Sequence, residues 1–349
     1  MKKLLTILLI TISIQYSFGQ KSKLNISIDE KIETIYAVAF LNNYFLVSPH
    51  DNLYKWKLKD DYKKLKNHKA VTLFDTLSKK HKFNGYKIVH WALQFDTFPT
   101  LNPIKQTAEP IEFVKGENEN LLAEFKTELI AFNNEPLFQK YWNEVQKLNK
   151  QVIKQVEKSL TIQNLPTYLE DYYGKKLSSY NLILSPFLHT GGFNAEMLSL
   201  NGQKEVYALV GPNGEIDFLP YFDKNYIETN MILHEFGHSF VNPVTDRYEK
   251  EIEKLKHKYY SKELEETGKN EGYNEWKYVF NELLLRATTI KIAEKHFGKN
   301  IANENLQKEI SAGFGLVEKM VKLLDEYEQN RKKYPTFDLF CPILFERMK

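Results

Sequence analysis

The sequence predicts an α+β fold that is mainly helical, with a small sheet beside a helix that carries a candidate metal-binding motif. Most of the chain places apolar residues three and four positions apart, which is the spacing of amphipathic helices. Short apolar or alternating runs of the kind that form strands are concentrated between residues 180 and 219. The next predicted helix contains His234, Glu235 and His238 in the pattern H-E-x-x-H.

The first 19 residues are predicted to be a secretory signal peptide. Lys2 and Lys3 precede an apolar run over residues 4–14, and small residues lead to a cleavage site after Gly19. We therefore expect an exported protein, periplasmic or extracellular, with residues 20–349 as one domain. No cysteine follows the apolar run, and Cys341 lies in an apolar segment, where we expect a buried thiol.

The N-terminal half is predicted to be helical up to about residue 165. Its helices are expected over residues 28–45, opened near Asp29, over 60–80, and over 121–160 with an interruption at Pro136. A proline-rich connecting loop is expected over residues 97–110. Residues 21–165 could form a helical subdomain, but no linker is clear enough to divide the chain.

The small sheet is expected in the middle of the sequence. Residues 180–184 read as a strand, and residues 205–219 as a hairpin that turns at Pro212-Asn213-Gly214. The H-T-G-G segment, residues 189–192, follows a strand and could line a cleft or be an ordinary turn.

A largely buried helix is predicted over residues 223–241, with Asp223 as its N-cap and Asn242-Pro243 as its end. Residues four apart lie on one helix face, so both imidazoles of H-E-x-x-H can bind one ion with the glutamate beside it. Gly237 within this helix costs about 1 kcal/mol relative to alanine. That cost suggests that another part of the chain packs closely against the backbone there.

A catalytic zinc site needs a third protein ligand and an open fourth position. The best candidate is Glu282, 44 residues after His238, at the edge of the apolar face of a helix predicted over residues 276–297. Arg286 follows one turn later, so a surface Glu–Arg ion pair is the alternative reading. The remaining candidates for the third ligand are Asp246, Glu249, Glu271 and Glu275. The metzincin pattern is excluded because valine occupies positions 241 and 244, where it requires glycine and histidine.

The segments H-E-F-G-H-S-F-V-N-P and W-K-Y-V-F-N-E-L-L-L-R-A resemble a bacterial family of secreted, zincin-like proteins of the gluzincin type. The resemblance is strongest over residues 226–290. It implies a zincin-like metallopeptidase fold and one Zn²⁺ per chain, with His234, His238 and Glu282 as ligands and Glu235 as general base. The family often has serine where this chain has Gly237.

The function expected from these features is hydrolysis of peptide bonds by zinc-activated water. A zinc hydrolase acting on a cell-wall amide or similar bond, and a non-catalytic zinc-containing binding protein, remain open, although Glu235 favours catalysis. Stabilisation of the oxyanion is expected from one of five residues: His189, Tyr248, His257, Tyr278 or Arg286.

Composition limits the partners. The net charge of +3 falls to +1 when Lys2 and Lys3 are removed, so nothing favours nucleic acid as a ligand. No later segment has the ~20 apolar residues of a membrane-spanning helix. We expect a peptide or protein substrate and leave the oligomeric state open.

The C-terminal part of the chain is predicted to be helical. Residues 247–274 are predicted to be a charged helical insertion that could act as a lid. Residues 301–331 are predicted to be a helix or a pair of helices broken near Gly313 and Gly315, and residues 334–348 a segment docked on the core.

Overall fold

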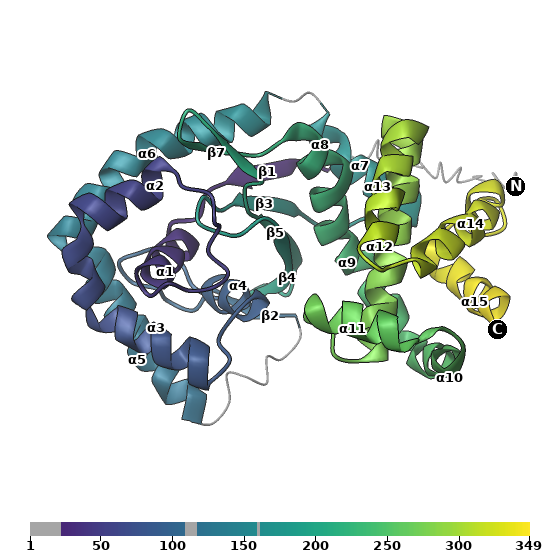
Figure 1. The fold of residues 1–349 in the computed structure, drawn as a ribbon, viewed down its shortest axis with the longest axis horizontal. Coiled ribbons are helices and arrows are strands. Elements are labelled where there is room, and N and C mark those ends of the chain that lie inside the picture. The colour runs from purple at the N-terminus through teal and green to yellow at the C-terminus, as the bar shows by residue number, and fades with distance from the viewer. Residues whose placement is uncertain (1–21, 109–116, 159–160) are drawn as a thin grey trace, which may run out of the picture.

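The computed structural model describes residues 22–108, 117–158 and 161–349, so the expected signal peptide lies outside the described residues. The described chain is mostly helical with a small mixed sheet, which confirms the α+β class (Figure 1). None of its helices combines the length and the apolarity that crossing a bilayer would require.

The main sheet has five strands in the order β1-β3-β5-β4-β2. Strands β1, β3 and β5 are parallel, whereas β4 is antiparallel to both β5 and β2. The strand bounds are β1 Leu24–Ser27, β2 Lys105–Thr107, β3 Tyr180–Leu184, β4 Gly192–Ser199 and β5 Lys204–Val210. The strand expected at residues 180–184 is therefore confirmed, while β2 lies inside the segment expected to be only a loop. A short edge strand such as β2 has little sequence pattern of its own.

The hairpin expected to turn at Pro212 is wrong. The antiparallel partner of β5 is β4, which precedes it, and the turn between them contains Asn201 and Gly202, with Gly202 at φ +78°. Asn-Gly is a strong hairpin signal, and it was not recognised in the sequence. After Pro212 the chain forms a separate two-stranded hairpin of β6 Gly214–Ile216 and β7 Leu219–Tyr221.

The sheet lies between two hydrophobic cores. Alternate residues of its strands, including Leu182, Ala208 and Val210, belong to a core formed mainly with the C-terminal helices. Their neighbours, such as Ile183 and Leu209, belong to a second core formed with the N-terminal helices. Successive side chains of a strand point to opposite faces of the sheet, so a strand buried on both faces contributes to both cores. The sheet therefore separates two lobes, an N-terminal lobe around the second core and a C-terminal lobe around the first.

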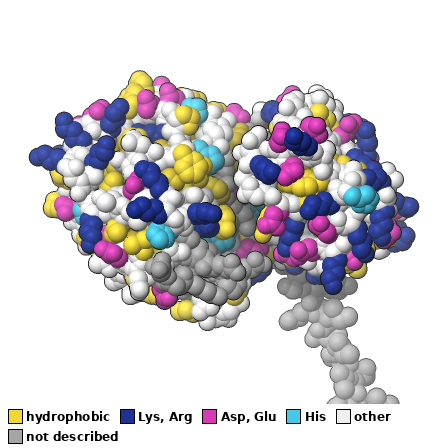
Figure 2. Space-filling view, turned by 60° about the horizontal axis from the view of Figure 1, so that its bottom comes forward, with side chains coloured by type: hydrophobic (Ala, Val, Ile, Leu, Met, Phe, Trp, Pro, Cys, Tyr) yellow, Lys and Arg dark blue, Asp and Glu magenta, His cyan; other side chains and the backbone are white. Residues whose placement is uncertain are grey.

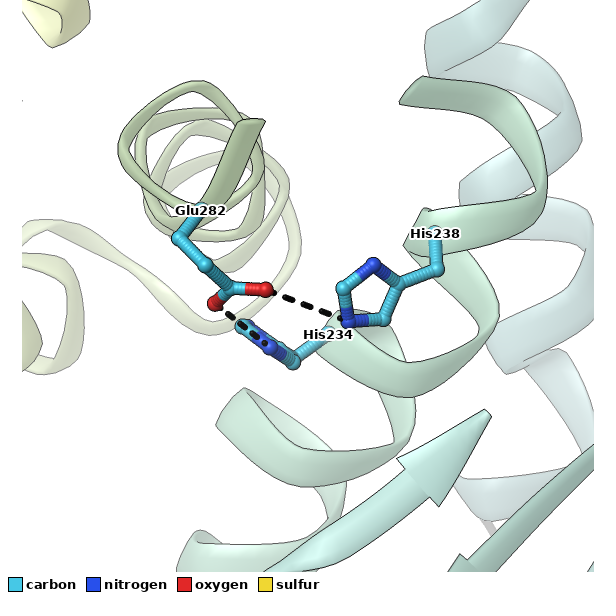
Figure 3. Close-up of side chains that lie close together, drawn as sticks. All are labelled: His234, His238 and Glu282. Carbon is cyan, nitrogen blue, oxygen red and sulfur yellow. Dashed lines mark ion pairs between the residues drawn. The ribbon is translucent and has the colours of Figure 1, made fainter. Parts of the chain in front are cut away.

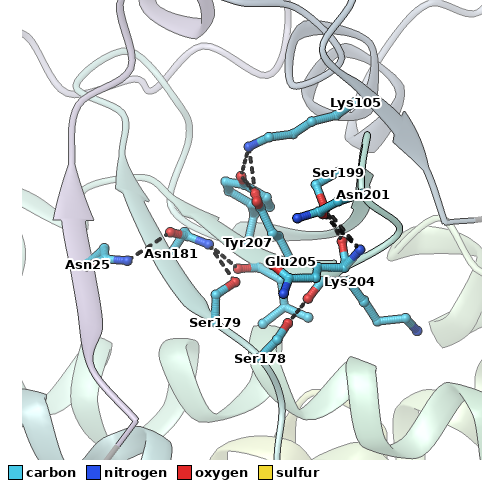
Figure 4. Close-up of polar contacts among 12 residues, drawn as sticks. Asn25, Lys105, Ser178, Ser179, Asn181, Ser199, Asn201, Lys204, Glu205 and Tyr207 are labelled. Atoms are coloured by element: carbon cyan, nitrogen blue, oxygen red, sulfur yellow. Dashed lines mark hydrogen bonds and ion pairs between the residues drawn. The ribbon is translucent and has the colours of Figure 1, made fainter.

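Polar side chains join the strands near the N-terminal ends of β1, β3 and β5 (Figure 4). Asn181 on β3 accepts from Asn25 of β1 at 3.2 Å and donates to the carbonyl of Val206 on β5 at 3.0 Å. Lys105 of β2 pairs with Glu205 of β5 at 2.6 Å. These contacts tie four strands together where the side chains are only partly buried.

In the described part of the chain, the N-terminal lobe contains helices α1 to α6 and two short π- and 3₁₀-helical segments. Asp29 caps the first helix by accepting from the N–H groups of Lys31 and Ile32, as expected. The continuous helix predicted over residues 60–80 is wrong: His68 is extended and its Nδ1 accepts from Ala70, so a new helix begins at Lys69. The elements are α1 Glu30–Leu41, α2 Leu53–Trp56, the π-helical Lys57–Asp61, the 3₁₀-helical Lys63–Asn67, α3 Lys69–Lys80, α4 Tyr86–Ala92, α5 Glu117–Asn134 and α6 Pro136–Glu157. The interruption expected at Pro136 is confirmed.

The helix that carries H-E-x-x-H belongs to the C-terminal lobe. Asp223 caps it as predicted, through a bond from the N–H of Tyr226 at 3.1 Å. It continues through α8 Lys224–Tyr226, a π-helical turn at Ile227–Met231 and α9 Ile232–Arg247, so the predicted end at Asn242-Pro243 is wrong. Val244 and Thr245 are fully buried, and this packing keeps the chain helical past the proline.

The remaining helices complete the C-terminal lobe around α12. The charged insertion is helical as expected, the break near Gly313 and Gly315 separates two helices, and the last segment docks on the core with Cys341 fully buried. The bounds are α7 Leu165–Tyr173, preceded by the 3₁₀-helical Ile162–Asn164, α10 Glu249–Tyr259, α11 Lys262–Asn270, α12 Trp276–Phe297, α13 Lys299–Ser311, α14 Leu316–Gln329 and α15 Phe337–Met348.

Candidate metal centre

The two helices that carry the motif residues, α9 and α12, pack against each other at Gly237. A Cβ added to this glycine would lie 2.5 Å from Leu285 Cδ1 on α12 and 3.3 Å from the Tyr173 hydroxyl on α7. Real Cβ atoms do not come this close to another atom, so a side chain here would displace Leu285 of α12. The close approach inferred from Gly237 is confirmed, and it brings α12 to the face of α9 that carries the histidines.

This packing places Glu282 of α12 opposite His234 and His238 of α9 (Figure 3). Glu282 Oε2 lies 3.4 Å from His234 Nε2, and Glu282 Oε1 lies 3.5 Å from His238 Nε2. All three side chains offer ligand atoms within 4.8 Å of one another. Nitrogen–oxygen hydrogen bonds are normally 2.7–3.2 Å. By contrast, donor atoms around a tetrahedral zinc with bonds of roughly 2.0–2.1 Å are roughly 3.3 Å apart. The spacing therefore fits a shared ion better than direct hydrogen bonds.

Burial supports the same conclusion. Glu282 is only 2% exposed, and its Oε2 has no hydrogen-bond partner among the described residues. Although burial raises the pKa of Glu282, the charges of His234, His238 and Arg286 lower it to about 2. A buried, ionised carboxylate oxygen without a hydrogen bond is costly, even with the charge of Arg286 3.7 Å away. A metal ion between Glu282 and the two imidazoles would remove that cost.

His238 is held in the orientation that a ligand requires. Its Nδ1 lies 3.1 Å from Asn242 Oδ1, one turn further along α9. Asn281 of α12 donates to the same Oδ1 at 2.8 Å. Because the amide oxygen can only accept, Nδ1 carries the proton and Nε2 presents a lone pair toward Glu282. Asn242, which was expected only to end the helix, instead fixes the ring.

Arg286 supports Glu282 from the other side. Its Nε lies 3.7 Å from Glu282 Oε2, and its Nη1 forms an ion pair with Glu309 of α13. The guanidinium also lies over the ring of Phe314, 4.2 Å from the centroid. The Glu282–Arg286 pair is therefore buried, and the reading as a solvent-exposed surface ion pair is wrong. Its role is to balance the charges of two neighbouring carboxylates.

Glu235 lies between the clustered side chains, whose charges affect it, and the first residue of β4. A Cβ on Gly192, the first residue of β4, would lie 2.7 Å from Glu235 Oε1, so the carboxylate rests against the strand backbone. Burial, the largest cause, together with the charge of Glu282 raises the pKa of Glu235 to about 7, against the opposing effects of His234 and Arg286. A carboxyl with this pKa can both accept and release a proton near neutral pH.

The other candidates for a third ligand are not joined to this site. Asp246 and Glu249 bind Lys277 at the surface, at 2.9 and 3.2 Å. Glu271 and Glu275 lie in the exposed connection before α12. Within the described residues, no other group of three histidine, cysteine or acidic side chains has the spacing of a metal site.

Two tyrosines that the sequence analysis did not consider lie near Glu235. Burial raises the pKa of Tyr226, and Glu235 adds to the shift. Burial also raises the pKa of Tyr273, to which Glu282 and Glu235 add while Arg286 opposes. Tyr273 lies in the connection that enters α12, and Tyr226 in the first turn leading to α9. Position next to these helices was the only available signal in a chain with 21 tyrosines.

The five residues considered for the oxyanion differ in their surroundings. Tyr278, one turn before Glu282, is half exposed, and the guanidinium of Arg286 is already paired. Tyr248 packs on Phe345, and the Nδ1 of His189 is 2.8 Å from the carbonyl of Thr190. His257 lies in α10. No distance singles out one of them.

No curated protein and no solved structure matches this chain. A family model, described as a domain of unknown function, DUF4932, matches residues 32–346, which include both lobes and the whole candidate site. The match extends over most of the sequence, and the chain therefore belongs to the DUF4932 family.

Proposed function

We propose that the chain is a zinc-dependent metallopeptidase with a zincin-like fold, exported from the cell by its N-terminal signal peptide. The observation that carries the proposal is the triad of His234, His238 and Glu282, whose ligand atoms lie within 4.8 Å of one another, with Glu282 3.4 and 3.5 Å from the two imidazoles. Glu235 follows His234 in the chain, and the charges of His234 and Glu282 affect its carboxyl. Two imidazoles and one carboxylate form a ligand set that leaves the fourth position open for water.

Zinc suits this donor set better than the hard cations. Magnesium and calcium prefer sites made of oxygen atoms, whereas this site offers two nitrogen atoms and a carboxylate. Bound to His234, His238 and Glu282, zinc would supply Lewis acidity to a water molecule and to the carbonyl of the substrate.

Glu235 would move the proton. Its carboxylate accepts a proton from the attacking water and passes it to the amine that leaves. Its contact with Gly192 holds it on the side of the site that faces β4. The intact carboxylate also favours catalysis over a purely structural metal site, which would have no use for a base.

The strand β4 provides a way to hold a peptide beside Glu235. An extended peptide can add to the open edge of a sheet through main-chain hydrogen bonds. Gly192 begins β4 next to Glu235, so a peptide paired there would have its backbone at the candidate base. The same chemistry could hydrolyse another amide, such as one of the cell wall, and this is the alternative that a substrate screen must distinguish.

The first test is the zinc content of purified residues 20–349. We expect one zinc per chain, lost in His238→Ala and in Glu282→Ala and retained in Glu235→Gln. Glu249→Ala is the matched control, because this glutamate follows α9 closely in sequence but binds Lys277 at the surface. If Glu282→Ala keeps its zinc, the third ligand is wrong.

The second test is catalysis. The wild-type protein should hydrolyse peptides from a mixed library, and Glu235→Gln should be inactive with its zinc in place. Hydrolysis of cell-wall fragments but of no peptide would favour the alternative. A wild-type chain that holds no metal after reconstitution with zinc would contradict both.

A further inference from the structure

The outer edge of β4 has a limited open stretch. The bonds from Gly211 N to Gly191 O and from Ser199 N to Gln203 O show that odd-numbered residues pair with β5. In an antiparallel ladder the alternate residues point their N–H and C=O groups the other way. The backbone groups of Gly192, Asn194 and Glu196 therefore face the outer edge.

Two of these three residues are already engaged. The carbonyl of Glu196 accepts from Ala108, next to β2, at 2.9 Å. The carbonyl of Asn194 is 3.1 Å from Nε2 of His90, a side chain of α4. Since a carbonyl can only accept, His90 carries its proton on Nε2 and donates it. Of these three residues, only Gly192 has neither its outward N–H nor its outward C=O in a hydrogen bond with the described part of the chain.

His90 is fixed in this role by its surroundings. Burial lowers its pKa, so the ring is neutral, and its Nδ1 has no hydrogen-bond partner among the described residues. It belongs to a short helix, α4, whose Ile88 and Val89 are fully buried in the N-terminal core. Because α4 is packed in this core, the His90 ring is held in place. It therefore occupies the outer edge of β4 at Asn194.

Helix α4 also places Tyr86 beside His90 at this edge of β4. Tyr86, one turn before His90, packs its ring edge-on to that histidine, with centroids 5.5 Å apart. It is half exposed; burial raises its pKa, and Tyr278 of α12, also half exposed, adds to the shift. Figure 2 shows hydrophobic side chains gathered on the left lobe beside the hollow that separates it from the right lobe.

We propose that His90 is a specificity-determining residue that ends the substrate-binding edge of β4 at Asn194. Strand residues advance about 3.3 Å each, so roughly two substrate residues fit between the position opposite Gly192 and the imidazole. On this side of the cleaved bond only about two substrate residues form main-chain bonds with β4, so a longer extended chain gains no further affinity. This proposal rests on the proposed function only in assuming that a peptide lies along β4.

The test measures peptide binding separately from hydrolysis. The zinc-loaded Glu235→Gln protein is titrated by calorimetry with peptides lengthened one residue at a time at either end. Affinity should rise at one end up to about the second added residue and then stay constant. In proteins that also carry His90→Ala or His90→Asn, whose side chains are too short to reach Asn194, the longer peptides should bind about three- to tenfold more tightly, the effect of roughly one main-chain hydrogen bond.

His90→Gln is the matched control, because its amide can still donate to the Asn194 carbonyl and should keep the plateau. The proposal is overturned if affinity keeps rising at both ends in the protein with His90, if removing His90 leaves the plateau unchanged, or if no peptide binds. Hydrolysis by the chain that keeps Glu235 is measured alongside. A plateau in binding without hydrolysis would refute the peptidase and leave the role of His90 standing.

Discussion

Replacing Gly192 with alanine should remove activity without removing the metal. The added Cβ would lie 2.7 Å from Glu235 Oε1, 2.9 Å from Glu235 Cγ and 2.8 Å from the carbonyl oxygen of Leu209. The strand cannot easily move, because β4 is paired with β5 over seven consecutive positions, from Gly192 to Leu198. The side chain of Glu235 therefore has to shift away from the strand.

The expected loss follows from that displacement. A misplacement of about 1 Å in a catalytic group costs on the order of 100-fold in rate, which is about 2.7 kcal/mol of activation free energy. Overpacking should also reduce the free energy of unfolding by roughly 1–3 kcal/mol. Zinc content should stay at one per chain, because the three atoms nearest the added Cβ belong to Glu235 and Leu209 and not to the clustered side chains. The assay combines kcat and KM on a cleaved peptide with zinc content and thermal unfolding.

Gly214→Ala is the matched control. A Cβ there has its nearest neighbour, Tyr221 Cδ1, at 3.8 Å, which is ordinary contact, and the residue lies in the separate hairpin of β6 and β7. Its kcat and zinc content should equal those of the wild type. Full turnover by a zinc-loaded Gly192→Ala protein would refute the reasoning, because Glu235 could not then be the base that rests on β4.

Three further changes probe other parts of the structure. Asn242→Ala frees the His238 ring and should weaken zinc binding about 10- to 100-fold in competition with a chelator; unchanged affinity would mean that the bond at 3.1 Å does not orient the ring. Burial raises the pKa of the Glu33 carboxyl from 4.5 to about 8 in the folded protein. The folded state therefore binds this proton more tightly than the unfolded state, and the resulting stability is fully present below pH 4.5. That stability, up to ~5 kcal/mol, is lost as the pH rises to 8. Glu33→Gln should flatten the pH dependence measured by urea unfolding, and an unaltered dependence would show that this carboxyl is not buried in its neutral form. Gly237→Ala should lower the free energy of unfolding by roughly 1–3 kcal/mol as Leu285 is displaced, and an unchanged unfolding curve would contradict the close packing of α9 on α12.

Local patterns predicted most of the helices and the three clustered side chains. His234 and His238 are four residues apart on one helix, so their common face follows from helix geometry alone. Glu282 could be found because it borders the apolar face of α12, and a carboxylate in that position needs a partner. The contact between α9 and α12 was signalled by Gly237, which is unfavourable in a helix unless something packs against it.

The errors arose where distant contacts decide the local structure. Pro243 should end a helix, yet the burial of Val244 and Thr245 carries α9 to Arg247. One error had a local cause instead: the turn at Asn201-Gly202, which indicates that β4 is the partner of β5, was not recognised. Asn281 and Glu309 approach the site from elements whose packing no sequence period specifies.

In the proposed enzyme, the metal site belongs to the C-terminal lobe, and the residue that ends the substrate-binding edge belongs to the N-terminal lobe. All three clustered side chains, with Arg286 and Glu309, come from helices of the C-terminal lobe. The edge of β4 is instead closed by His90, whose helix packs on the N-terminal core. Changes around α12 and α13 should therefore act first on zinc affinity, whereas changes in α4 should act on KM and on peptide length with the zinc unaltered. Within a family that shares this fold, the helices of the N-terminal lobe are then where differences in substrate would be expected, while the metal site stays the same.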